Sequence, residues 1–123
     1  MDRELLLEKI KELKSELQDG LIATSIFNQE DGKAIVEYNT QKESTRAYDN
    51  ITNYIITTFR EYNISNIDKY MIFSIEDNNI LIIIPLFNYR WAILVDNDIV
   101  KLGVLLKITI PSIQKKFKLI LEY

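Results

Sequence analysis

The first segment of the chain sets apolar residues among charged ones at a helical spacing. Leucine or isoleucine recurs every three or four residues, and Glu and Lys occupy the remaining faces. This pattern predicts an amphipathic helix over residues 2–18. Asp19-Gly20 follows as a stop signal, because glycine accepts the left-handed backbone that closes a helix. The apolar positions are Leu6, Ile10, Leu13 and Leu17.

Two segments rich in β-branched and aromatic residues come next. They are residues 21–27 (LIATSIF) and 33–38 (KAIVEY), and they flank the turn-forming sequence NQEDG at 28–32. A β-hairpin is therefore expected.

Residues 43–62 return to a helical spacing, and their apolar face is unusually wide. Ala47 and Tyr54 on one flank and Ile56 on the other extend this face to roughly 200°. One contact with a core cannot cover so wide a face, and Ser44 is a candidate for the helix cap. The central positions of the face are Tyr48, Ile51, Ile55, Phe59 and Tyr62.

Three apolar segments follow, at 69–75, 80–87 and 91–95, separated by short polar turns at 76–79 and 88–90. Three antiparallel strands fit this order. The middle segment shows no polar alternation, so both of its faces should be covered and helices should flank the sheet on two sides. Pro85 cannot donate to a strand ladder and should mark a bulge or a frayed end.

Periodicity alone does not decide the structure of the last third of the chain. Apolar residues between Val100 and Ile110 alternate as in a strand, yet several of them also satisfy a helical repeat. Pro111 forbids an ordinary continuous helix through that point. Residues 112–121 are helical on either interpretation.

Composition narrows the class of function. With 123 residues and 47% apolar content, the chain has the size and core of one domain, residues 1–123. Net charge is −3 with both signs interspersed, which disfavours nucleic acid as a partner. The absence of Cys and His removes the common nucleophile, general base and zinc ligands, so we expect no enzyme activity, catalytic residue, metal or cofactor.

The sequence also bears on location and on other ligand motifs. Residues 1–18 do not have the pattern of a signal peptide, and no apolar run approaches the roughly 20 residues that span a bilayer, so we expect a cytoplasmic protein without a membrane span. The three glycines stand at 20, 32 and 103, too far apart for a phosphate-binding loop. The acidic segments at 76–79 and 96–98 lack the spacing of a calcium loop and are interpreted as turns.

Tyr89-Arg90-Trp91 combines residue types that are enriched at binding hot spots. Trp91 is expected to begin a strand and pack in the core. Tyr89 and Arg90 are expected on a turn, where they are weak candidates for contact with a partner.

The predicted order α-β-β-α-β-β-β-α resembles the roadblock domain of dynein light chains and bacterial GTPase regulators. Residues 19–27 with 31–36 resemble the first hairpin of that family, and residues 102–107 (LGVLLK) resemble the Leu-Gly opening of its last helix. The resemblance implies an α/β (α+β) fold of the profilin-like type. We therefore expect a three-layer α/β/α domain with a five-stranded antiparallel sheet and a kinked last helix from about Val100.

The resemblance further implies a homodimer formed by the second helix and an adjacent edge strand. The wide apolar face of that helix gives an independent reason to expect association. Roadblock proteins commonly bind small Ras-like GTPases, so the resemblance implies a non-catalytic regulator or adaptor of such a GTPase. Two alternatives stay open: a profilin-like sensory domain that binds a small apolar ligand, and a structural dimer subunit of a larger complex. The expected dimer-interface residues are Ala47, Tyr48, Ile51, Tyr54, Ile55, Tyr70 and Ile72.

Overall fold

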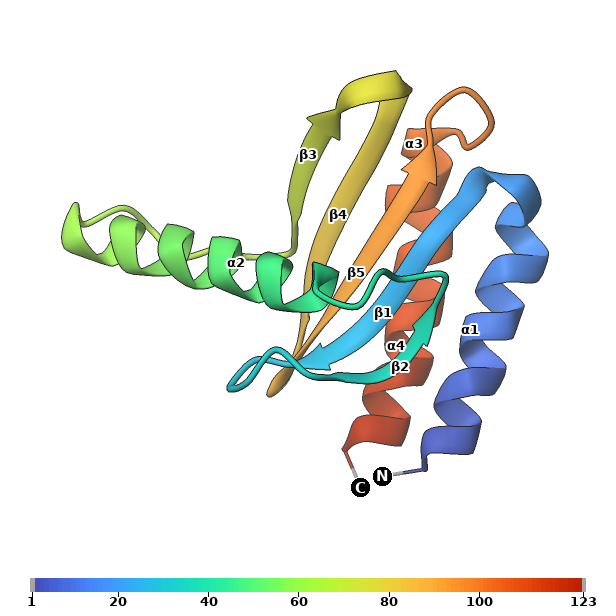
Figure 1. Cartoon of the computed structure of the whole chain (residues 1–123), viewed down its shortest axis with the longest axis horizontal. Coiled ribbons are helices and arrows are strands. Elements are labelled where there is room, and N and C mark those ends of the chain that lie inside the picture. Colours follow the sequence, from blue (N-terminus) through green and yellow to red (C-terminus); the bar gives the residue numbers. More distant parts are fainter. Residues whose placement is uncertain (1, 123) are drawn as a thin grey trace.

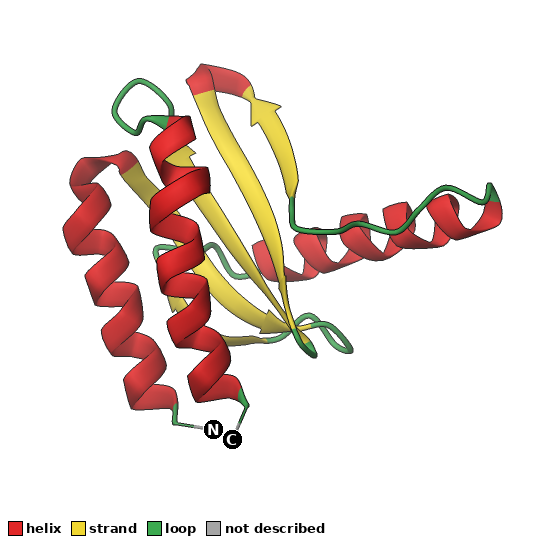
Figure 2. Ribbon diagram, turned by 180° about the vertical axis from the view of Figure 1, so that it is seen from behind, coloured by secondary structure: helices red, strands yellow, loops and turns green. Residues whose placement is uncertain are grey.

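The computed structural model describes residues 2–122 and contains one five-stranded antiparallel sheet with the order β2-β1-β5-β4-β3. Helices α1 and α4 lie side by side on one face, and α2 crosses the other (Figures 1 and 2). The predicted α/β/α layers and element order are confirmed. The elements are α1 (Arg3–Leu17), β1 (Leu21–Asn28), β2 (Ala34–Tyr38), α2 (Ser44–Glu61), β3 (Met71–Ile75), β4 (Asn79–Leu86), β5 (Tyr89–Asp96), α3 (Leu102–Val104) and α4 (Ile110–Leu121).

Helix α1 begins at a side-chain cap and ends in a way that the sequence did not predict. Asp2 accepts hydrogen bonds from the backbone N–H groups of Glu4 and Leu5, at 3.1 and 3.2 Å. At the other end Gln18, not Gly20, takes the left-handed backbone, with a φ of 49°. Gly20 is needed for space, because a Cβ built on it would lie 2.3 Å from Cγ2 of Val100.

The main core lies between the sheet and the helices α1 and α4. Trp91 is fully buried, as predicted, and its ring meets that of Phe117 edge to face with 4.9 Å between centroids. Its indole Nε1 donates to Oγ1 of Thr24, and this hydroxyl donates to the carbonyl of Ala92, both at 2.8 Å. The polar atoms of this core are thereby satisfied.

Strand β4 is covered on both faces, as its uninterrupted apolar sequence predicted. All residues from Ile80 to Ile84 are buried. Strand β3 pairs with β4 only as far as Met71 opposite Ile83, so Pro85 lies beyond that pairing. This position agrees with the expected frayed end.

The C-terminal segment is helical from Leu102 to Leu121, as the resemblance implied, and the alternative of a sixth strand is excluded. Helix α3 passes through a π-helical turn, Leu105–Thr109, into α4. Pro111 lies in the first turn of α4. Proline lacks an N–H and its ring crowds the preceding turn, and the wider π-helical turn lets the chain continue past it.

The turn between β4 and β5 is shorter than predicted. Tyr89 and Arg90 belong to β5, paired with Leu86 and Pro85, and the turn consists of Phe87 and Asn88. Phe87 allows this short turn by adopting a φ of 55°.

Among residues 2–122, no helix combines the length and apolarity that crossing a membrane would require.

Candidate protein-binding surface

Helix α2 faces the sheet with polar residues. Its buried residues are Thr45, Asp49 and Thr52, at helical spacings of four and three. The apolar arc, which we define as Tyr48, Ile51, Ile55, Phe59 and Tyr62, is turned from the sheet by roughly a quarter of a turn. Within this arc Tyr48, Ile55 and Phe59 are half-buried, whereas Ile51 and Tyr62 are exposed.

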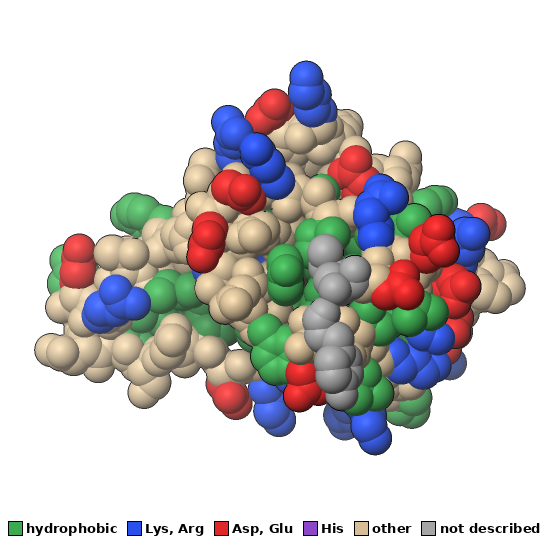
Figure 3. All heavy atoms as spheres, turned by 90° about the horizontal axis from the view of Figure 1, so that it is seen from below, with side chains coloured by type: hydrophobic (Ala, Val, Ile, Leu, Met, Phe, Trp, Pro, Cys, Tyr) green, Lys and Arg blue, Asp and Glu red, His purple; other side chains and the backbone are tan. Residues whose placement is uncertain are grey.

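The exposed side chains of α2 show how little of this apolar surface is covered. Tyr54 is 74% exposed, Tyr62 73% and Ile51 44%, and Ala47 is also exposed. Helix α2 extends beyond the sheet past β3 (Figure 1), and Figure 3 shows hydrophobic side chains along this projecting arm. The arm therefore presents apolar surface that the rest of the chain leaves open to solvent.

Strand β3 lies at the edge of the sheet next to this arm. Its sequence, MIFSI, contains none of the charged or proline residues that protect natural edge strands from pairing. Ile72 is 40% exposed, and Ile75 is exposed as well. The free edge can accept another strand.

A groove of about 570 Å³ joins the two features. Its walls come from the distal half of α2, from the chain that returns from it, and from β3. Among the predicted dimer-interface residues, the structure brings Ile55, Tyr70 and Ile72 together here, whereas Ala47, Ile51 and Tyr54 lie along α2 and half-buried Tyr48 packs against Phe27. The groove is lined by Ile55, Phe59, Ile67, Asp68, Lys69, Tyr70, Met71, Ile72 and Phe73.

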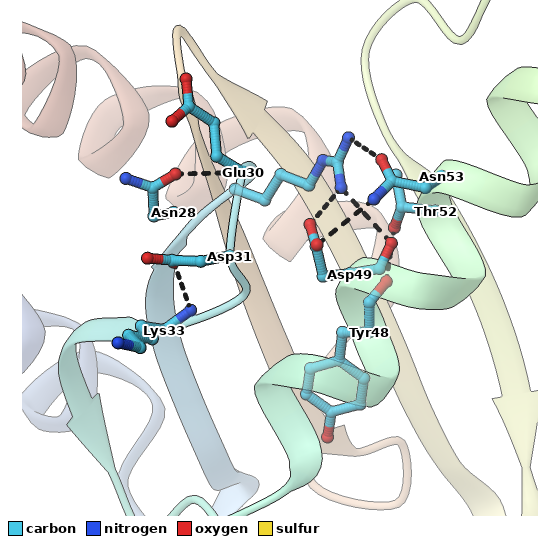
Figure 4. A network of polar contacts seen from close by, with 9 residues as sticks. Asn28, Glu30, Asp31, Lys33, Tyr48, Asp49, Thr52 and Asn53 are labelled. Atoms are coloured by element: carbon cyan, nitrogen blue, oxygen red, sulfur yellow. Dashed lines mark hydrogen bonds and ion pairs between the residues drawn. The ribbon is translucent and has the colours of Figure 1, made fainter.

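A buried ion pair fastens the first half of α2 to the sheet (Figure 4). Nη1 of Arg90 donates to Oδ1 of Asp49, and both side chains are more than nine-tenths buried. Nη2 of Arg90 donates to Oδ1 of Asn53 at 2.9 Å, and Nδ2 of Asn53 donates back to Oδ2 of Asp49 at 3.3 Å. One guanidinium on β5 thus holds two residues one helical turn apart.

Burial controls the ionisation of this pair. Desolvation raises the pKa of Asp49, opposed by the charge and hydrogen bond of Arg90. Desolvation likewise lowers the pKa of Arg90, opposed by Asp49.

Gly32 lets the β1–β2 turn approach α2, because a Cβ there would lie 3.3 Å from Cα of Arg46, and its φ of 70° suits glycine.

The weak partner-binding prediction for Tyr89 and Arg90 assumed an exposed turn, and that assumption is wrong. Arg90 is buried and bound to Asp49, and Tyr89 is half-buried in β5. The sequence argument also missed Asp49 and Asn53. A signal was present, since Thr45, Asp49 and Thr52 form a polar stripe beside the apolar arc.

The acidic turns form structural contacts with each other. Nδ2 of Asn78 donates to Oδ1 of Asp98 at 2.6 Å, which joins the segments at 76–79 and 96–98. Within residues 2–122, no three carboxylates gather in a way that could hold a metal ion. In the same part of the chain, the hollow between β4 and the α3–α4 segment has buried Ile84 and Ile110 at its base but an exposed rim, so it is an open groove and gives no support to a ligand enclosed between sheet and helix.

The sequence matches no family model and no curated protein. Its structure is similar to MglB of Myxococcus xanthus, with a TM-score of 0.80 and 9% identity over 98% of this chain and 90% of that chain. It is also similar to the gliding protein MglB from Thermus thermophilus, with a TM-score of 0.76, 10% identity and coverage of 97% and 90%. A third similar structure is a Roadblock/LC7 domain from Streptomyces avermitilis, with a TM-score of 0.68 and 11% identity over 92% of this chain and 94% of that chain. The resemblance predicted from the sequence is confirmed in three dimensions, and the chain has the roadblock fold.

Proposed function

We propose that this protein is a cytoplasmic, non-catalytic homodimeric regulator or adaptor that binds a small Ras-like GTPase. The observation that carries the dimer is the position of α2, whose apolar arc extends past the sheet beside the unpaired edge of β3. Exposed apolar surface and a free strand edge are both features that a second copy of the chain can cover.

The two features fit one symmetric interface. If β3 pairs with β3 of a second copy about a two-fold axis, the sheet continues across both subunits and each distal α2 lies near the other subunit. Tyr54, Ile51 and Ile72 would then pass from solvent into the interface. A similar solved structure is MglB with a tetrameric arrangement (TM-score 0.62, 7% identity over 83% of this chain), so association of this fold has a precedent.

The GTPase part of the proposal rests on the roadblock likeness. Some roadblock proteins stimulate GTP hydrolysis by positioning groups of the GTPase itself, and by that mechanism this chain would need no catalytic side chain. The part of α2 that stays outside the dimer contact would then be available to the GTPase, since aromatic side chains of the kind it carries contribute binding energy in protein interfaces.

Light scattering on the purified protein tests the dimer. The parent should have the mass of two chains, and Tyr54→Glu should shift it to one, because a charge would be buried in an apolar contact. Ile108→Glu is the matched control, since Ile108 is a largely exposed apolar residue in the π-helical turn between α3 and α4. A monomeric parent would overturn the dimer, and a dimer that survives Tyr54→Glu would show that another face of α2 is used.

Binding to a candidate GTPase is tested by capture of small Ras-like GTPases loaded with GDP or with a non-hydrolysable GTP analogue. A regulator should prefer one nucleotide state, and Tyr54→Glu should weaken capture if the dimer presents the site. Equal capture of both states would favour the structural-subunit alternative. Absence of capture would remove the GTPase from the proposal while leaving the dimer intact.

A further inference from the structure

A second and larger groove, of about 850 Å³, lies on the α4 side of the sheet. Residues 68–70 line both this groove and the one beside α2, so they separate the two. The groove lies where β3 stops pairing at Ile83, so that the end of β4, still paired with β5 on its other side, has no strand on its β3 side. It therefore lies on the opposite side of residues 68–70 from the groove beside α2, and Tyr70 alone of its lining residues belongs to the expected dimer interface.

The floor of the groove is apolar. Ile84 and Ile110 are buried at its base, and Phe87 stands 56% exposed at its rim. Tyr70 and Leu106 are half-buried and pack against the main core. Apolar side chains of a bound segment would find matching surface here.

Gly103 lines this groove although the fold does not require a glycine there. It lies in α3, outside the left-handed region of backbone space, and a Cβ built on it would meet no atom within 4 Å. Glycine in a helix costs about 1 kcal/mol relative to alanine. The missing side chain leaves room in the groove without relieving any contact within the chain.

The rim carries an excess of positive charge. Three lysines line the groove against one acid, Asp68, although the net charge of the chain is −3. Nζ of Lys118 lies 5.8 Å from the centroid of the Phe87 ring, so charge and apolar surface alternate at close range. The lysines are Lys69, Lys107 and Lys118.

We propose that this groove binds an acidic peptide segment of a partner protein, anchored by apolar side chains. Carboxylates would face the three lysines while the apolar side chains enter the floor. A concave groove with an apolar floor suits a peptide better than a flat lipid surface. Because α2 lies on the other face of the sheet, the protein could hold this segment and a GTPase at the same time.

Selection from a phage-displayed library of random 12-residue peptides tests the proposal. In the variant Gly103→Phe, a large side chain fills the open space beside residue 103. Peptides that bind this variant are first removed from the library, and the remaining peptides are then selected on the wild type. We expect enriched peptides to combine Asp or Glu with apolar residues. Synthetic versions should bind the wild type and Gly103→Ala alike, and Gly103→Phe and Lys118→Glu at least tenfold more weakly.

Lys115→Glu is the matched control, because it changes the charge of the same helix outside this groove and should leave the affinity unchanged. Failure to enrich peptides, enrichment of peptides without acids, or equal binding to Gly103→Phe would overturn the proposal. Binding of phosphatidylserine vesicles that Lys118→Glu abolishes, without peptide binding, would assign the groove to lipid. Loss of the dimer in folded Gly103→Phe would assign it to a second copy of the chain, which the Tyr54→Glu experiment reports separately.

Discussion

The two faces of the sheet hold their helices by different means. On one face, α1 buries Leu6, Ile10 and Leu13, and α4 buries Ile110, Ile113 and Phe117, all at helical spacings. On the other face, α2 buries two threonines and an aspartate, and its clearest tie to the sheet is the Asp49–Arg90 pair. Apolar burial thus fixes α1 and α4 to the sheet, whereas polar contacts orient α2.

This difference separates residues that serve the fold from residues that remain for association. A helix that buried its apolar arc against its own sheet would leave little apolar surface exposed for binding another molecule. Helix α2 is held by a polar stripe, so its aromatic and aliphatic residues stay available. The following experiments test this division, from the largest expected effect to the smallest.

Phe117→Ala should be the most damaging of these substitutions. It removes a fully buried ring that packs edge to face against Trp91, and such a truncation costs about 4 kcal/mol of unfolding free energy. Tyr62→Ala on α2 is the control and should change the stability of the monomeric Tyr54→Glu background by less than about 0.5 kcal/mol. Urea denaturation of both variants measures the contrast, and equal losses would contradict it.

Arg90→Met should destabilise the protein by about 3 kcal/mol, because it leaves the buried carboxylate of Asp49 without its cation. The double variant Asp49→Leu/Arg90→Met removes both charges and should recover most of the loss. A double-mutant cycle measured by urea denaturation gives the coupling between the two sites. If the single variant were as stable as the parent, the pair would not be what holds α2.

The N-terminal ends of α1 and α2 also differ, because α1 has a side-chain cap and α2 has none. Asp2→Ala should cost about 1 kcal/mol, since the Asp2 side chain accepts two backbone hydrogen bonds at the start of α1. Ser44→Ala should cost nothing comparable, because α2 begins at Ser44 with Glu43 in the cap position and has no side-chain cap. The suggestion from the sequence that Ser44 caps this helix is therefore wrong. Thermal unfolding of the two variants provides the measurement.

The sequence predicted the parts of the fold that local patterns determine. The leucine repeat of α1 and the apolar run of β4 each have one physical solution, and the structure adopts it, whereas the helix continues past Pro111 through a π-helical turn. The ambiguity between strand and helix after Val100 was resolved by the family resemblance, because both periods were present in the residues themselves.

The orientation of α2 could not be predicted from its own pattern. A helical wheel gives the direction of the apolar arc, but it cannot tell whether that arc meets the chain's own sheet or another molecule. Two facts decide this: Arg90 belongs to β5, and it pairs with Asp49. The sequence argument placed Arg90 on a turn, so the polar stripe of α2 had no visible partner.

The smallest expected effect is a pair of pKa shifts in opposite directions, for two carboxyl groups that lie on opposite sides of the sheet. Glu12 on α1 is exposed and accepts hydrogen bonds from Lys9 at 2.8 Å and from Lys116 of α4 at 3.1 Å, and these lysines lower its pKa. Burial raises the pKa of Asp49 instead, with the nearby charge of Asp31 adding to that direction. Titration of both carboxyl groups by NMR should place Glu12 below and Asp49 above the usual range.

Linkage then gives opposite dependences of stability on pH. The contribution of Glu12 is present above its unfolded pKa and is lost as pH falls through the lowered folded value. The contribution of Asp49 is present below its unfolded pKa and is lost as pH rises through the raised folded value. Relative to Glu12→Gln the parent should therefore lose stability on acidification, and relative to Asp49→Asn it should gain. An Asp49 pKa below the usual range would mean that Arg90 outweighs burial, and that α2 is held by attraction between charges more strongly than its desolvated setting indicates.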